Sequence, residues 1–346
     1  MPIRVLIVDD SLTMRMALRQ VLSHGDFELV GEATNGQEAI ELCRERKPDV
    51  ITMDMMLPIM SGLAATEYIM AYFPTPIVVV SAAQNRGELY KTYDALAAGA
   101  VDVVEKPTGD EPDGVWEAAL ASTLRVVSRI HVISHPRAKL TKEPSPTSRK
   151  PKPGVVRIVA LGTSTGGPGA LVRILNSLPK DFSLPIVAVI HLASAFAKSF
   201  VQWLSEQTAR PVSFAVEGEL VVDKAGCVVL APPDYHLRVT AGQFRLSTDA
   251  ERHSCRPSVD VLFESLALEM PRQVVACLLT GMGKDGAVGL LQLRKAGAVT
   301  IAQSEESCVV FGMPREAVSL GAASHVLSLG EIGTTLSALP GANGGT

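Results

Sequence analysis

The first 125 residues alternate between short apolar runs and segments with helical periodicity. The apolar runs are IRVLIV, FELVGEA, DVITM, PIVVVSA and VDVV, and helix-period stretches such as 11–23 and 37–46 lie between them. Short β-branched runs that alternate with helices are typical of a parallel sheet with helices on both faces. Five such strands, followed by a helix near 113–130, predict a flavodoxin-like doubly wound domain over 1–125, with its functional groups at the carboxyl ends of the strands.

A second series of apolar runs fills residues 154–340. VVRIVALG comes first, followed by a glycine-rich turn and a predicted helix at 168–177, and IVAVIH, CVVLAP, VVACLLTG and AVTIAQ follow later. Several of these runs precede helix-like segments, so this half is also predicted to be an α/β domain with a doubly wound sheet. No internal repeat of fixed period is visible.

Residues 126–153 separate the two predicted domains. The stretch from His131 to Gly154, HVISHPRAKLTKEPSPTSRKPKPG, has five prolines, many Lys and Arg, and almost no apolar residues. It buries too little apolar surface to offset the entropy lost on ordering, which predicts an inter-domain linker. Its basic charge would also suit a polyanion-binding arm, but we interpret it as a spacer.

Composition narrows the class of protein. The 346 residues are 47% hydrophobic and 20% charged, as in globular proteins, and the net charge of -4 argues against a generally basic nucleic-acid binder. Five scattered cysteines without a CxxC pair predict no zinc site or disulfide framework and favour a reducing compartment. The N-terminus is not a signal peptide, and no apolar stretch approaches the roughly 20 residues of a membrane span. We therefore expect a soluble, cytoplasmic protein without membrane insertion.

Three carboxylates follow strands of the first domain. Asp9 and Asp10 come directly after the first strand, and Asp54 comes at the end of the third. If these strands are adjacent, the carboxylates converge, and like charges this close need a cation. An all-oxygen cluster selects a hard divalent ion such as Mg²⁺.

A hydroxyl and an ammonium group are predicted at the same edge of the sheet. Ser81 ends the fourth strand, and Lys106 follows the fifth and precedes a proline. A metal, a hydrogen-bond donor and a cation are what a phosphoryl group on a carboxylate requires. Taken singly, such residues are commonly helix N-caps or solvated loop charges; the joint pattern of five residues at four strand ends favours a phosphoacceptor site.

Residues 1–125 resemble the response-regulator receiver domain. The resemblance rests on Asp9-Asp10, Asp54 within MDMMLP, Ser81-Ala82 and Lys106-Pro107. The resemblance implies that a histidine kinase transfers a phosphoryl group to Asp54. It also implies that Asp10 and Asp54 hold Mg²⁺, that Asp9 acts through a water, and that Ser81 and Lys106 contact the phosphoryl oxygens. Val103 and Met56 depart from common receiver usage.

A serine lies on a predicted strand-to-helix turn of the second domain. Ser164 lies within GTSTGG, and such a turn needs small flanking residues, because a substrate must approach the backbone. The start of the following helix leaves free N–H groups suited to an oxyanion. A helix N-cap and a phosphate-binding turn are the alternatives that the motif alone leaves open.

A nucleophilic serine needs a base and an orienting acid. Of four histidines after the linker, His191 immediately follows the run IVAVI and so is expected at the same strand-end edge as Ser164. The others are in the polar turn PPDYH (His236), in ERHSC (His253) and in ASHVLSL (His325). Asp285 lies in the glycine-dense LTGMGKDG after a third strand and is the candidate acid.

Long motifs give residues 154–340 a second resemblance. These residues resemble the catalytic domain of the chemotaxis protein-glutamate methylesterases. The motifs that carry the resemblance are GTSTGGP, the His after IVAVI, RPSVDVLF, LTGMG followed by DG one residue later, and IAQ followed by SCVVFGMPREA. A receiver, a basic linker and this domain form that family's architecture. The resemblance implies a triad of Ser164, His191 and Asp285, with active-site positions at Thr165 and Met282 whose neighbouring backbone N–H groups bind the oxyanion.

The resemblance also implies the biological setting. The enzyme would demethylate glutamate methyl esters on the cytoplasmic helices of chemoreceptors and deamidate specific glutamines, under control of a chemotaxis histidine kinase. The esterase step would need no cofactor. The segment 190–196 departs from the family pattern, as does Lys284, where Asn is usual.

Two other function classes stay open at this point. A general α/β-hydrolase esterase would pair Ser164 with Asp260 or Asp285 and then with His325, since its acid precedes its histidine in sequence. A non-enzymatic, receiver-linked adaptor would bind receptors or a kinase without chemistry. The joint presence of Ser164, His191 and Asp285 favours an enzyme.

Overall fold

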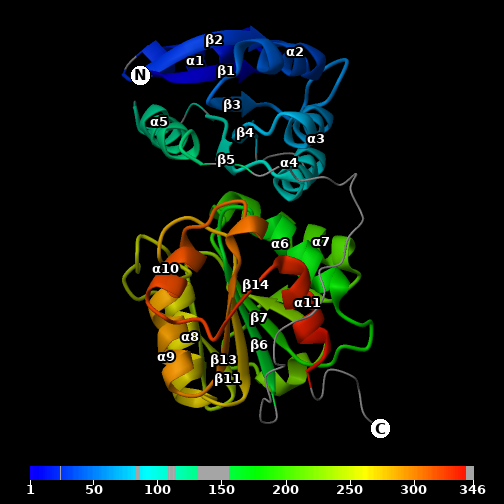
Figure 1. Ribbon diagram of the computed structural model, residues 1–346, viewed down its shortest axis with the longest axis vertical. Helices are drawn as coiled ribbons and strands as arrows, with labels where there is room; N and C mark the ends of the chain where they lie inside the picture. Colours follow the sequence, from blue (N-terminus) through cyan, green and yellow to red (C-terminus); the bar gives the residue numbers. More distant parts are fainter. Residues whose placement is uncertain are drawn as a thin grey trace. The chain divides into compact units, whose positions relative to one another are not determined.

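Two units make up the chain, Met1–Glu143 and Pro144–Thr346. The computed structural model describes residues 1–23, 25–82, 86–107, 109, 112, 114–130, 132 and 156–339. Each unit is described by itself below (Figure 1). Residues 133–153 of the predicted linker lie outside the described residues.

The first unit is a five-stranded parallel sheet with strand order β2-β1-β3-β4-β5. Its elements are β1 (Ile3–Val8), α1 (Leu12–Ser23), β2 (Phe27–Ala33), α2 (Gly36–Arg46), β3 (Val50–Met53), α3 (Gly62–Tyr72), β4 (Ile77–Ser81), α4 (Arg86–Ala98), β5 (Asp102–Glu105) and α5 (Val115–Val127). Helices α1 and α5 pack together, and α2 and α4 each contact α3. The predicted flavodoxin-like fold is confirmed.

Local sequence explains these elements. Strands β3 and β4 are buried along their whole length, as expected for central strands covered on both faces. Helix α1 buries Met14, Leu18, Val21 and Leu22, which recur at helical spacing along one face. Helix α2 begins at Asn35, whose side chain accepts hydrogen bonds from the first-turn N–H groups.

The second unit contains a seven-stranded sheet, in the order β14-β13-β12-β6-β7-β9-β8, in which every neighbouring pair is parallel. Its strands are β6 (Ile158–Thr163), β7 (Ile186–Ile190), β8 (Val212–Phe214), β9 (Val228–Leu230), β12 (Val274–Leu278), β13 (Val299–Gln303) and β14 (His325–Leu327). Strands β10 (His236–Thr240) and β11 (Gln243–Ser247) form a separate antiparallel hairpin. The predicted α/β class is confirmed.

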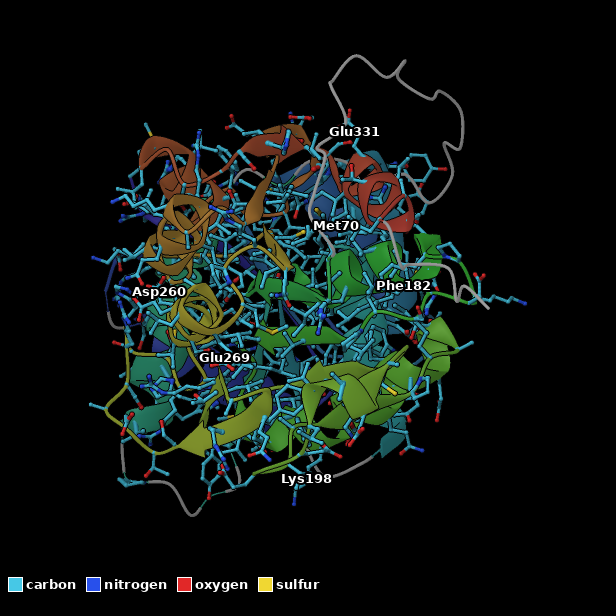
Figure 2. The ribbon with its side chains drawn as sticks, turned by 90° about the horizontal axis from the view of Figure 1, so that it is seen from below. Met70, Phe182, Lys198, Asp260, Glu269 and Glu331 are labelled. Atoms are coloured by element: carbon cyan, nitrogen blue, oxygen red, sulfur yellow. The ribbon has the colours of Figure 1, made fainter. Side chains whose placement is uncertain are left out.

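Helices cover both faces of this sheet. They are α6 (Gly167–Ser177), α7 (Ser194–Thr208), α8 (Val259–Glu269), α9 (Ala287–Lys295), α10 (Met313–Ser319) and α11 (Leu329–Ser337), with short 3₁₀ turns at Val221–Lys224 and Glu305–Ser307. Helices α8, α9 and α10 lie on one side of the sheet, and α6, α7 and α11 on the other (Figure 1). Figure 2 labels Asp260 on α8 and Glu331 on α11 on these opposite sides. None of the described helices is both long and apolar enough to span a membrane.

The hairpin β10–β11 differs from the sequence prediction, which placed His236 in a polar turn. His236 is the first residue of β10 and is buried; its Nδ1 accepts a hydrogen bond from the Ser258 N–H at 3.2 Å. The signal was present in HLRVT-AG-QFRLS, where Ala241 and Gly242 both have positive φ, as a two-residue hairpin turn of type I′ requires. The short edge strands β8 and β14 were also missed.

Contact between α8 and α9 depends on a residue without a side chain. A Cβ on Gly289 would lie 2.7 Å from the Phe263 Cβ and 2.9 Å from the Asp260 carbonyl oxygen. We therefore expect Gly289→Ala to lower the free energy of unfolding of this unit by about 1–3 kcal/mol, the usual cost of overpacking. Calorimetry of the full chain would measure it.

Gly330 provides the matched control, because it also lies in the first turn of a helix, α11, and a Cβ there would meet nothing within 4 Å. Gly330→Ala should be neutral or stabilise by up to about 1 kcal/mol. Equal effects of the two substitutions would contradict the packing argument.

Candidate functional site

The structure brings Ser164, His191 and Asp285 to three neighbouring strand ends. Ser164 directly follows β6 and His191 directly follows β7, while Asp285 lies in the loop between β12 and α9. The order β12-β6-β7 makes these the adjacent central strands of the sheet. Chain connections run outward from β6 in both directions, so the three residues lie at the topological switch point, where ligands of open α/β sheets bind.

Small residues shape the turn that carries Ser164. The Ser164 N–H donates to the Thr280 carbonyl at 3.1 Å, and the Gly167 N–H donates to the Ser164 carbonyl at 2.8 Å. Gly166 has a φ of +78°, which a side chain would strain. A Cβ on Gly281 would lie 2.9 Å from the Ser164 Cβ, so glycine there permits the two loops to approach.

Two backbone N–H groups beside Ser164 have no acceptor among the residues that the structure describes. Neither the Thr165 N–H nor the Met282 N–H donates a hydrogen bond to another described residue. Thr165 follows Ser164 directly. Met282 follows Gly281, and Gly281 packs against Ser164. Unpaired donors at a strand-to-helix turn are suited to bind a negatively charged oxygen.

The imidazole of His191 is held by Asp285. Its Nε2 lies 2.9 Å from the Asp285 Oδ2, and its backbone N–H donates to the Thr163 carbonyl at 3.1 Å. The other ring nitrogen, Nδ1, lies 3.7 Å from the Cys255 Sγ. The Ser164 hydroxyl makes no hydrogen bond to another described residue, so His191 and Ser164 are not hydrogen-bonded in this structure.

Asp285 also accepts three hydrogen bonds from the start of α8. The Ser258 hydroxyl donates to its Oδ1 at 2.7 Å, the Val259 N–H to its Oδ2 at 2.7 Å, and the Asp260 N–H to its Oδ1 at 3.1 Å. Burial favours the neutral acid, but hydrogen bonds from His191, Ser258 and Val259 outweigh it and lower the pKa of Asp285. The carboxylate is therefore ionised at neutral pH, and Nε2 of His191 carries the proton.

The charge state of His191 reflects these partners. Burial works to lower its pKa, but the hydrogen bonds to Asp285 and Cys255 and the charges of both raise it to about 9.

Cys255 and Ser258 were not assigned a role from sequence. The N-cap pattern of Ser258 before VDVL was readable, and its hydroxyl accepts from the Val261 N–H, but its bond to Asp285 joins segments that only the fold brings together.

The other histidines have different surroundings. His253 Nε2 lies 3.1 Å from the Asp260 Oδ2, and His236 is held by Ser258 and by the Ala250 carbonyl. His325 begins β14, which lies three strands from β6 in the sheet. With about 4.8 Å between strands, His325 is roughly 14 Å from the serine strand, too far to accept a proton from Ser164.

In the first unit, the acidic residues gather at the carboxyl ends of β1 and β3. Asp9, Asp10 and Asp54 have carboxylate oxygens within 4.8 Å of one another. The Lys106 Nζ lies 3.0 Å from the Asp9 Oδ2 and 3.1 Å from the Asp54 Oδ2. The buried Asp54 Oδ1 accepts no hydrogen bond from a described residue. An unpaired buried oxygen among carboxylates fits a hard cation such as Mg²⁺.

Electrostatics differ between these groups. Burial raises the pKa of Asp54, against the opposing effect of Lys106. For Lys106, burial works to lower the pKa, but the charges of Asp54 and Asp9 outweigh it and the pKa is raised. Ser81 ends β4, as expected, but its hydroxyl donates to Glu88 at 2.9 Å and accepts from Thr92 at 2.9 Å.

Fold and site together define a class of protein. Serine, histidine and aspartate at adjacent strand ends of a parallel α/β sheet are the arrangement of a hydrolytic enzyme. The five-stranded unit with an acidic strand-end cluster and a lysine has the arrangement of a phosphoacceptor domain.

Comparison with known proteins identifies the family. The CheB methylesterase family model matches residues 159–336, and the response regulator receiver domain model matches residues 5–113. The chain belongs to the CheB methylesterase family and is an enzyme of that class with an N-terminal receiver domain.

Individual relatives match nearly the whole chain. A protein-glutamate methylesterase/protein-glutamine glutaminase 3 of Hahella chejuensis (strain KCTC 2396) is 40% identical, covering 97% of this chain and 98% of that protein. A protein-glutamate methylesterase/protein-glutamine glutaminase of Nitrosospira multiformis (strain ATCC 25196 / NCIMB 11849 / C 71) is 41% identical, covering 99% of each. The crystal structure of the Thermotoga maritima CheB methylesterase catalytic domain is 38% identical and matches with a TM-score of 0.51, covering 54% of this chain and all of that one.

The raised pKa of His191 predicts a pH-dependent stability. Its pKa rises from an ordinary 6.5 to about 9 in the folded protein, so the charged imidazole stabilises the fold below pH 6.5. That stabilisation is lost as the pH rises from 6.5 through 9. We expect the free energy of unfolding of the second unit to fall by about 3 kcal/mol over this range, measured by urea unfolding. His191→Gln should flatten the pH dependence; an unchanged slope would contradict it.

Proposed function

We propose that this protein is a phosphorylation-controlled esterase that hydrolyses glutamate methyl esters on the cytoplasmic helices of chemoreceptors, and that it deamidates specific glutamines there. The observation that carries the proposal is the hydrogen bond between His191 and Asp285 at the strand end next to Ser164. The names of the relatives support the two activities. Chemotaxis signalling in the cytoplasm is the setting that follows.

The reaction begins at Ser164. Its Oγ attacks the ester carbonyl, and Nδ1 of His191 accepts the hydroxyl proton, because Nε2 is held by Asp285. His191 returns the proton to the methoxy oxygen as the bond between that oxygen and the carbonyl carbon breaks, and methanol leaves. Water, deprotonated by the same nitrogen, then attacks the acyl carbon, and the proton passes to the Ser164 Oγ as the bond between the acyl carbon and Oγ breaks, which releases the glutamate carboxylate. For a glutamine side chain, ammonia is the leaving group.

Backbone donors and Asp285 support the charges that develop. The Thr165 and Met282 N–H groups are the proposed donors to the oxyanion of the tetrahedral intermediate, since neither is paired within the described protein. Asp285 holds the imidazole in the reactive tautomer and stabilises the imidazolium. Its own three hydrogen bonds from the start of α8 fix its position.

Asp54 is the proposed phosphoacceptor, with a chemotaxis histidine kinase as the phosphodonor. Asp9, Asp10 and Asp54 would hold Mg²⁺, consistent with the unpaired Asp54 Oδ1. When bound, the cation supplies neutralisation of the phosphoryl oxygens. Lys106, now paired with Asp9 and Asp54, and Ser81, now paired with Glu88, would exchange these partners for the phosphoryl group.

Control follows if the receiver domain inhibits the esterase until Asp54 is phosphorylated. Phosphorylation shifts such an equilibrium by the difference in interaction free energy between the two states of the receiver. A coupling of about 1–3 kcal/mol corresponds to roughly 5- to 150-fold in activity. The domain limits 1–125, 126–153 and 154–340 stay part of this proposal.

The two alternative functions lose support. An α/β-hydrolase arrangement needs His325 near Ser164, and three strand spacings separate their strands. An adaptor without chemistry does not require the ionised, fourfold hydrogen-bonded Asp285 beside His191.

The mechanism predicts the effects of three substitutions. Ser164→Ala and His191→Ala should each lower the rate of methanol release from methylated receptor membranes by roughly 10⁴- to 10⁶-fold, because each removes a member of the triad. Asp285→Asn should cost somewhat less. His325→Ala is the control and should retain nearly full activity. Full activity in Ser164→Ala, His191→Ala or Asp285→Asn would remove that residue from the mechanism.

Phosphorylation should depend on Asp54 alone. Asp54→Asn removes the acceptor oxygen with little change in shape, so the variant should take up no phosphoryl group from acetyl phosphate and Mg²⁺ and should not be activated.

The fragment 153–346 should be several-fold more active than the unphosphorylated full chain and indifferent to the phosphodonor. A folded fragment less active than the full chain would refute inhibition by the receiver, and stoichiometric labelling of Asp54→Asn would refute the assignment.

A further inference from the structure

The catalytic base has a neighbour to which the proposed mechanism gives no role. The Cys255 Sγ lies 3.7 Å from Nδ1 of His191, within hydrogen-bonding distance for sulfur. This is the nitrogen that must accept the proton of Ser164 in the proposed function. The sulfur also lies 3.4 Å from the His253 carbonyl oxygen, to which the S–H can donate.

The imidazole cannot offer its other nitrogen instead. Nε2 faces Asp285, whose two oxygens are already fixed by Ser258, Val259 and the Asp260 N–H. A ring flip would turn the protonated nitrogen away from an ionised, buried carboxylate, at the cost of a charge-assisted hydrogen bond. Cys255 and Ser164 are therefore restricted to the same nitrogen.

The position of the sulfur is set by its turn. The backbone N–H of Cys255 donates to the Arg252 carbonyl at 2.9 Å, and the Arg252 N–H donates to the Cys255 carbonyl at 3.1 Å. His253 and Ser254 between them both have positive φ. Reciprocal hydrogen bonds close this turn, and the Arg252 side chain binds Glu264 on α8, so the thiol is presented at a defined place.

We propose that Cys255 is a positioning residue that competes with Ser164 for Nδ1 of His191 and thereby holds the catalytic base in a resting state. In that state the thiol proton moves to Nδ1, leaving a thiolate beside an imidazolium, and no base is available for Ser164. Activity requires the proton to return to sulfur and the imidazole to hydrogen-bond the serine hydroxyl instead. The inference rests on the proposed function.

The charges around His191 agree with this arrangement. Asp285 and Cys255 are the titratable groups that act on it, and both raise its pKa against the effect of burial. Behind Asp285 on the α8 side are Asp260 and its partner His253, with the Arg252 guanidinium 4.0 Å from Asp260. Removing the thiol removes one of the two direct contributions and leaves the Asp285 contact intact.

The first test is the pH profile of methanol release by the full chain. Cys255→Ala should move the base-dependent limb toward lower pH by about one unit, which raises activity near pH 7 by about tenfold. Cys255→Ser keeps the size and polarity but removes the sulfur that pairs with Nδ1, so it should behave like Cys255→Ala. An unmoved profile, or a serine variant that behaves like the wild type, would overturn the proposal in favour of a structural role.

The second test does not depend on hydrolysis. In full-length Ser164→Ala, iodoacetamide at pH 7 should alkylate Cys255 about tenfold faster than Cys227, and adding His191→Ala should abolish that difference, because an imidazolium partner stabilises the reactive thiolate. Cys227 is the matched control, since it is also half-buried and contacts the Ala225 carbonyl. Equal rates for the two cysteines would overturn the thiol–imidazole pair.

The two tests separate failure of the inference from failure of the proposed function. Retained hydrolysis in Ser164→Ala would refute the proposed serine mechanism, while the alkylation rates would still decide whether Cys255 and His191 form a pair. Loss of hydrolysis in Ser164→Ala with equal alkylation rates would leave the mechanism standing and refute the inference.

Discussion

The buried carboxylate of Asp285 is the group on which the catalytic unit depends. It accepts hydrogen bonds from Ser258, Val259 and Asp260 at the start of α8 and from the ring of His191 after β7. A buried charge without partners would be costly, but donors at a helix N-terminus and a histidine compensate for its desolvation. One side chain therefore joins the loop after β12, the start of α8 and the end of β7, two strands away in the sheet, so that the same interactions stabilise the fold and orient the imidazole of His191.

Fixing the imidazole of His191 in this way limits what the rest of the site can do. With Nε2 bound to Asp285, only Nδ1 remains for chemistry, and the elements around it determine its partner. The serine turn and the loop after β12 lie close together because Gly281 lacks a Cβ that would collide with Ser164, and because Gly166 accepts a left-handed backbone. The turn that ends at Cys255 places its sulfur 3.7 Å from this nitrogen.

The receiver unit solves a similar electrostatic problem with different groups. Asp9 and Asp54 are buried side by side, and Lys106 compensates both by binding one oxygen of each. The Asp54 Oδ1 is left without a partner among the described residues, which keeps it open to a cation or a phosphoryl group. In both units the parallel sheet makes the site possible, because strands that run in one direction bring their following loops to one edge.

The sequence alone determined the strand runs, the α/β class of both units and the residues that follow the strands. These are local properties: apolar runs of strand length, glycine around Ser164, and charged residues directly after buried segments such as Asp9, Asp54 and His191. Only the tertiary structure decided that β12, β6 and β7 are neighbours, that His236 is buried, and that Ser258 and Cys255 contact Asp285 and His191. Each of these facts is a hydrogen bond or packing contact between segments distant in the chain, and such contacts depend on strand order and helix placement rather than on the residues near each partner.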